Sequence, residues 1–192
     1  DEKGNKQLTL VVGSSWPQDE QFLLPFFNGH KEMKMVIAPH EIHEEHLAAI
    51  EKALERPCKR LSAVRSAEDL KGVDCLIIDC FGLLSSIYRY GEIAYVGGGF
   101  GAGIHNTLEA AVYGVPVLFG PKYGKFKEAK DLVEAGGAFP VNSGEEFAAC
   151  MKRLMTDAKA LHDAGEASGN YVSRQVGATD KILPEIMKDI PS

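Results

Sequence analysis

The sequence predicts an α/β domain built on a doubly wound parallel sheet. Short apolar, β-branched runs alternate with helical patterns along almost the whole chain, which is the rhythm of successive βαβ units. Most of these runs are apolar on both faces, as strands are when helices cover both sides of a parallel sheet. The 192 residues contain no internal repeat, low-complexity tract or long linker. A single domain, residues 1–192, therefore accommodates the chain.

Strands and helices are expected in alternation along the chain. The expected strands are Leu8–Val12, Met35–Ala38, Lys59–Ala63, Cys75–Ile78, Ile93–Val96, Val115–Phe119 and Ala138–Val141. The helices expected between and after them are Asp19–Phe27, Glu44–Leu54, Leu83–Tyr90, Thr107–Tyr113, Lys127–Ala135 and Glu145–Thr156. The tail from Ala158 to Ile190 has two further helical stretches and no strand pattern.

The composition is that of a soluble globular protein, with 45% hydrophobic and 25% charged residues. A formal net charge of −6 argues against a nucleic-acid partner. The most apolar stretch, Val73 to Leu84, is too short for a membrane span and contains Asp74 and Asp79. The first four residues are polar and predict no secretory signal. The 4 cysteines form no CxxC pair, so we expect free thiols in a reducing compartment.

The most unusual segment is the glycine-rich loop from Gly97 to Gly103, which follows the strand Ile93–Val96. In an open parallel sheet, ligands bind beyond the carboxyl ends of the strands. Asn106 is the expected N-cap of the next helix, whose free N–H groups would suit an anion. The glycines would let a phosphate approach the backbone, and the carboxylate of Glu109 could accept hydrogen bonds from a ribose diol.

Two interpretations of this loop remain open from its residues alone. The loop has neither the P-loop signature GxxxxGK[ST] nor an in-frame GxGxxG, which excludes the common mononucleotide motif and weakens a dinucleotide site. It is then either a nucleotide site of another kind or a tight connection that binds no ligand.

Several sequence blocks together resemble a known family. Residues 94–100 read AYVGGGF, residues 105–111 read HNTLEAA, and residues 114–121 read GVPVLFGP. With the upstream blocks Ala38–Glu41 (APHE) and Asp79–Leu84 (DCFGLL), they resemble the 3-deoxy-D-manno-octulosonic acid (Kdo) transferases over most of the stretch from Leu8 to Val141. The resemblance implies a Rossmann-like sheet that forms the C-terminal, donor-binding half of a two-domain glycosyltransferase of the GT-B type. Members of that family are roughly twice as long, so the acceptor-binding N-terminal half is expected to be absent from this chain.

The resemblance also implies a reaction and a set of binding residues. The donor would be CMP-Kdo, and Kdo would pass to a hydroxyl of a lipid A precursor at the cytoplasmic face of the bacterial inner membrane, which the full-length protein would contact peripherally. The catalytic base would be a glutamate of the missing half, so no catalytic residue, metal or cofactor is expected in this chain. The isolated domain should bind CMP weakly and be inactive. The implied nucleotide-binding residues are Pro39 and His40 for the cytosine or its phosphate, Gly82, Leu83 and Leu84 through backbone groups, Asn106, Thr107 and Leu108 for the phosphate, and Glu109 for the ribose.

Two departures from the family pattern keep alternatives open. Leu83 stands where the family has a glutamate, and residues 100–104 lack its usual arginine. The alternatives are the donor domain of a UDP-sugar GT-B transferase or epimerase, and a nucleotide-binding module without catalysis.

Two smaller features also have more than one interpretation. The histidines His40, His43 and His46 could be a solvated face, a metal cluster or, for His40 alone, part of the nucleotide site. Trp16 could belong to the core or contact a ligand.

Overall fold

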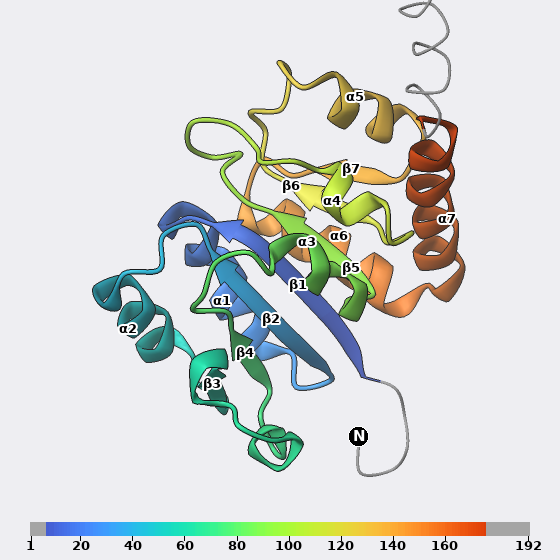
Figure 1. The fold of residues 1–192 in the computed structure, drawn as a ribbon. Coiled ribbons are helices and arrows are strands. Elements are labelled where there is room, and N and C mark those ends of the chain that lie inside the picture. The colour runs from blue at the N-terminus through green and yellow to red at the C-terminus, as the bar shows by residue number, and fades with distance from the viewer. Residues whose placement is uncertain (1–6, 176–192) are drawn as a thin grey trace, which may run out of the picture.

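A computed structural model describes residues 7–175 of the chain. All strand pairs in it are parallel, and they form one 7-stranded sheet with the order β3-β4-β2-β1-β5-β6-β7 (Figure 1). The strands are β1 (Leu8–Ser15), β2 (Met33–Pro39), β3 (Cys58–Arg60), β4 (Cys75–Ile77), β5 (Ile93–Val96), β6 (Val117–Phe119) and β7 (Ala138–Pro140). The predicted fold class is confirmed, because a strand forms within or overlapping each of the expected runs.

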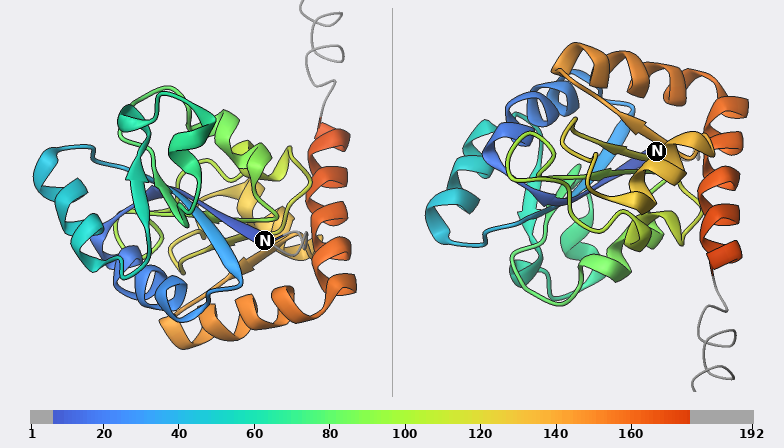
Figure 2. Two further views of the ribbon diagram at one scale, coloured as in Figure 1. Left: turned by 90° about the horizontal axis from the view of Figure 1, so that it is seen from below. Right: turned by 90° about the horizontal axis from the view of Figure 1, so that it is seen from above.

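Helices cover both faces of the sheet. They are α1 (Pro17–Gly29), α2 (Glu44–Ala53), α3 (Leu84–Ile87), α4 (Leu108–Ala111), α5 (Lys127–Glu134), α6 (Gly144–Thr156) and α7 (Ala158–Gln175). One core joins α1, α2 and α6 to one face, and a second core joins α3, α4 and α5 to the other. Viewed along the sheet, α1 and α6 lie on the same side (Figure 2). Each large apolar side chain that these cores bury contributes about 1.5–3 kcal/mol.

The order of the strands places a topological switch point at the centre of the sheet. The chain builds one half of the sheet from β1 through β2 to the β3 edge, and then crosses to β5 on the other side of β1. The helix after β1 packs on one face, and the helix after β5 packs on the opposite face. Ligands of doubly wound sheets bind in the crevice that such a reversal opens at the carboxyl ends of the strands.

The expected strand Lys59–Ala63 is wrong at its carboxyl end. The strand stops at Arg60, and Leu61–Ala63 forms a 3₁₀ turn. The reason is local hydrogen bonding. Both the backbone N–H of Ser62 (2.9 Å) and its hydroxyl donate to the carboxylate of Asp79, so Ser62 cannot extend the strand ladder.

Two helices are shorter than the sequence pattern predicts. The expected helix Leu83–Tyr90 is one α-helical turn, α3, followed by a 3₁₀ turn at Tyr88–Tyr90. The expected helix Thr107–Tyr113 is α-helical only over α4, because Gly114 donates to the carbonyl of Ala111 (3.0 Å) and adopts a φ of 67°, which ends a helix. In the tail, α7 is the first of the two expected helical stretches, and the second falls outside the described residues.

Within residues 7–175, no helix combines the length and apolar composition that crossing a membrane requires.

Candidate functional site

Loops that follow β1, β2 and β5 meet at the carboxyl edge of the sheet. The indole of Trp16 stacks on the imidazole of His40, with ring centroids 4.4 Å apart and an interplanar angle of 23°. The rings of His40 and His105 lie 4.6 Å apart, and the indole N–H of Trp16 donates to Nε2 of His105 (3.4 Å). We call Trp16, His40 and His105 the aromatic triad. It joins segments that lie up to 89 residues apart in the sequence.

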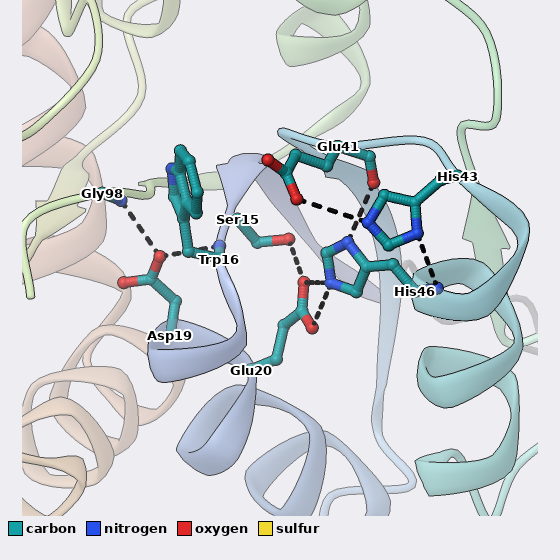
Figure 3. Close-up of polar contacts among 8 residues, drawn as sticks. All are labelled: Ser15, Trp16, Asp19, Glu20, Glu41, His43, His46 and Gly98. Carbon is teal, nitrogen blue, oxygen red and sulfur yellow. Dashed lines mark hydrogen bonds and ion pairs between the residues drawn. The ribbon is translucent and has the colours of Figure 1, made fainter. Parts of the chain in front are cut away.

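A fully buried carboxylate, Asp19, ties the start of α1 to the glycine loop (Figure 3). One of its oxygens accepts hydrogen bonds from the backbone N–H groups of Trp16 (3.0 Å) and Gly98 (3.0 Å). The other oxygen accepts the hydroxyl of Tyr95 (2.7 Å). Burial, and then the charge of Asp19, raise the pKa of Tyr95, so the phenol remains a donor. Asp19 thereby fixes the loop after β5 relative to the loop after β1.

The three histidines that follow β2 have separate roles. His46 is buried, and its Nε2 lies 2.9 Å from the carboxylate of Glu20, which also accepts the hydroxyl of Ser15 (2.8 Å) (Figure 3). His43 is exposed and accepts the backbone N–H of His46 (3.2 Å) at the start of α2. The solvated interpretation therefore fits His43 and fails for His46. In the described part of the chain, no group of three or more His, Cys, Asp or Glu side chains could hold a metal ion.

Two cavities open beside the aromatic triad. The β2–β4 cavity, of about 220 Å³, is lined by Ser14, Ala38, Pro39, His40, Ile42, Ile78, Cys80, Phe81, Gly82 and Leu84. The β5 cavity, of about 510 Å³, is lined by Ile104, His105, Asn106, Thr107, Leu108, Phe126 and Glu128. Because His40 lines the first and His105 the second, a ligand that lies over this pair of rings would reach both.

Most of the predicted binding residues gather in these cavities. Pro39, His40, Gly82 and Leu84 line the β2–β4 cavity, and Asn106, Thr107 and Leu108 line the β5 cavity. Leu83 and Glu109 line neither cavity. Among the described residues, the backbone N–H groups of Gly82, Leu83 and Leu84 donate no hydrogen bond, so they remain available to a ligand.

Two glycines of the loop are required by the chain's own backbone. A Cβ atom on Gly97 would lie 2.2 Å from the carbonyl oxygen of Ser14, and one on Gly99 would lie 2.6 Å from Cα of Gly120. Side chains at these positions would therefore push neighbouring loops apart. Neighbouring backbone therefore requires glycine at Gly97 and Gly99 whether or not a ligand binds, and the approach of a phosphate to this loop stays a prediction.

The start of α4 also differs from the prediction. Thr107, rather than Asn106, is the N-cap residue, while Oδ1 of Asn106 accepts the N–H of Leu108 (3.0 Å). The helix has a single turn, so its macrodipole is small. What it offers is individual donors, because the N–H groups of Thr107 and Glu109 have no acceptor within residues 7–175. The carboxylate of Glu109 is half-buried and accepts from the side-chain amide of Asn106 (3.3 Å).

Comparison with known proteins gives the site a context. No protein-family model matches the chain. The chain is 32% identical over 198 residues to a 3-deoxy-D-manno-octulosonic acid transferase of Rickettsia bellii, a match that covers 97% of this chain and 46% of that protein. It is 29% identical over 175 residues to the enzyme of that name from Aquifex aeolicus, covering 86% and 48% of the two chains. The chain therefore spans about half the length of the curated relatives it matches.

A solved structure has the same fold. The C-terminal CMP-Kdo binding domain of WaaA from Acinetobacter baumannii aligns with a TM-score of 0.73 and 18% identity, over 86% of this chain and 89% of that one. At this identity the likeness establishes the architecture of the domain.

Proposed function

We propose that this chain, which belongs to the 3-deoxy-D-manno-octulosonic acid transferase family, is the half of a GT-B glycosyltransferase that binds CMP-Kdo for transfer of Kdo to a lipid A precursor. The observation that carries the proposal is the 32% identity to the Rickettsia bellii transferase across 97% of the chain. Two further observations support it. The fold is that of a CMP-Kdo binding domain, and seven of the nine predicted binding residues line two adjoining cavities at one edge of the sheet.

The phosphate would lie in the β5 cavity. CMP carries a single phosphate, and the N–H groups of Thr107 and Glu109 supply donors for it without a metal. Asn106 contributes indirectly, because its side chain occupies the N–H of Leu108 and shapes the turn. Donors aimed at the phosphate stabilise the charge that develops on CMP as it leaves the sugar.

The nucleoside would extend from there toward the β2–β4 cavity. Pro39 and His40 would lie beside the cytosine, and the N–H groups of Gly82, Leu83 and Leu84 are available to its polar edge. The role survives the replacement of the family's glutamate by Leu83, because it uses the backbone. Glu109 would accept the ribose hydroxyls in exchange for its present bond from Asn106.

The remaining chemistry is assigned to other parts of the whole protein. Attack by an acceptor hydroxyl needs a general base, which we place in an acceptor-binding half outside these residues. The chain alone should then bind the donor and transfer nothing. Because the acceptor is a lipid, we place the whole protein at the cytoplasmic face of the inner membrane, in peripheral contact with it.

Titration with CMP and with UDP tests the donor assignment. We expect CMP to bind with a Kd on the order of 1 mM, equivalent to about −4 kcal/mol, and to shift the backbone NMR signals of residues 106–109. Asn106→Ala should weaken binding several-fold, because the turn that presents the N–H groups of Thr107 and Glu109 loses the hydrogen bond that holds it. Asn170→Ala, an exposed position on α7, is the matched control.

The same titration separates the alternatives. Tighter binding of UDP than of CMP would favour a UDP-sugar donor. No heat and no NMR shift with millimolar CMP would rule out the donor assignment.

A further inference from the structure

The hydrogen bond from Trp16 to His105 fixes the tautomer of the histidine. The indole N–H can only donate a hydrogen bond. Its acceptor, Nε2 of His105 at 3.4 Å, must therefore carry a lone pair. A neutral imidazole with a lone pair on Nε2 has its proton on Nδ1. Trp16 thus selects a neutral His105 that can donate through Nδ1.

Neighbouring contacts orient the ring. A Cβ atom on Gly98 would lie 3.2 Å from Cδ2 of His105, so the edge formed by Cδ2 and Nε2 faces the protein. The backbone N–H of His105 donates to the carbonyl of Gly97 (3.3 Å), and the ring of His40 lies against it. Nδ1 is on the opposite edge of the ring, and within residues 7–175 it has no hydrogen-bond partner.

Burial favours the neutral form of His105. Burial, followed by the neighbouring His40, lowers the pKa of His105, and the charge of Asp19 opposes this shift. The carboxylate-bearing Glu128 of α5 also lines the β5 cavity. The ring lines this cavity beside Asn106 and Thr107, where the N–H groups described above are available.

We propose that Nδ1–H of neutral His105 donates a hydrogen bond to the phosphate of the bound CMP moiety, and that Trp16 is the positioning residue that selects the required tautomer. The inference rests on the proposed function, since it assumes that a cytidine nucleotide occupies the site. It adds a side-chain donor to the backbone donors at the start of α4. This donor strengthens its bond as charge builds on the departing phosphate, and it needs no proton uptake to do so.

Substitutions of His105 test the side-chain donor. The amide nitrogen of asparagine is bonded to Cγ, as Nδ1 of histidine is, so asparagine places an N–H donor at nearly the same point. Phenylalanine keeps an aromatic ring but has no donor. In CMP titrations at pH 7.5, we expect His105→Phe to weaken binding about tenfold, the effect of losing one hydrogen bond to a charged group. His105→Asn should retain binding within about threefold. His162→Asn, on the exposed side of α7, is the control and should bind as the unmodified chain does.

The outcomes separate this inference from the proposed function. If the unmodified chain does not bind CMP, the proposed function fails and takes the inference with it. If the unmodified chain binds CMP and His105→Phe binds equally well, the inference alone is overturned.

NMR of the imidazole nitrogens tests the tautomer without any ligand. We expect the unmodified chain to carry the His105 proton on Nδ1 at pH 7.5. Trp16→Phe keeps an aromatic ring beside His40 but removes the indole N–H, so the pKa of His105 should rise and the tautomers should mix. A proton found mainly on Nε2 of the unmodified chain would overturn the inference. So would a CMP affinity that falls about tenfold per unit from pH 7 to 8.5, because that slope would identify the imidazolium as the binding form.

Discussion

Replacing Asp19 by alanine and by asparagine should have very different effects on stability. Alanine leaves three donors without an acceptor at a fully buried position, namely the N–H groups of Trp16 and Gly98 and the hydroxyl of Tyr95. Each orphaned buried donor costs about 1–3 kcal/mol. With some relief from water entering the space left by the carboxylate, we expect Asp19→Ala to lower the free energy of unfolding by about 3–6 kcal/mol.

Asparagine can preserve all three contacts. Both N–H donors converge on one oxygen of Asp19, which the amide oxygen can replace. The amide N–H₂ then takes the place of the other oxygen and donates to the hydroxyl of Tyr95, which rotates to accept. The hydrogen bonds lose only the contribution of the carboxylate charge, so we expect Asp19→Asn to lower the free energy of unfolding by about 1 kcal/mol.

Urea denaturation of the two variants, beside Tyr95→Phe, measures the difference. Tyr95→Phe removes one hydrogen bond and should cost about 1 kcal/mol. A cost for Asp19→Asn equal to that of Asp19→Ala, or a cost below about 1 kcal/mol for Asp19→Ala, would refute this account of the contacts.

Three other predictions concern separate features. Arg56→Ala should lower the free energy of unfolding by about 3–5 kcal/mol, because the buried guanidinium donates to the carbonyls of residues 27, 30 and 33 and to Asp74. In chemical denaturation, the exposed control Lys71→Ala should lower it by less than about 0.5 kcal/mol. Equal losses in the two variants would contradict the burial argument. Burial raises the pKa of Asp74, but the hydrogen bond from Lys34 and the charge of Arg56 more than offset it, and the folded-state pKa lies below its usual value. The stability that Asp74 contributes is therefore complete above an unfolded pKa of about 3.9 and is lost as the pH falls through the folded value. In urea titrations between pH 5 and pH 2, Asp74→Asn should lose less stability than the unmodified chain does, and an unchanged loss would show that other groups cause it. Glu109→Ala should abolish a preference for CMP over dCMP in paired titrations, while an undiminished preference would mean that Glu109 does not bind the ribose.

The sequence was sufficient to predict the sheet, and the physical reason is two-sided burial. A strand covered on both faces is mostly apolar, as β1 is over residues 10–12 and as β5 is along its whole length, and such runs are easily recognised. The short helices were harder to predict. The apolar spacing over 107–113 is compatible with an α-helix, but it carries no information on whether the chain tightens to i→i+3 bonds before Gly114.

Only part of the site could be predicted, because some of its contacts join residues that are far apart in the sequence. Topology indicates that loops at one edge meet, and the relatives confirm the family that residues 94–121 resemble. Neither source brings Trp16 and His105 together, since that contact depends on the close approach of loops 89 residues apart. Asp19 has the sequence signature of an ordinary acidic residue in the first turn of a helix, and its bond to Gly98 has no local signal.

The composition of the aromatic triad has a practical consequence. Trp16 is the 1 tryptophan of the 192 residues, and its indole stacks on one histidine while it bonds another. The intrinsic fluorescence of the protein therefore originates beside the candidate ligand. Because a ligand that lies over the aromatic triad changes the surroundings of the indole, the emission should change when such a ligand binds. The chain thus carries its own optical reporter of nucleotide binding, with no label required.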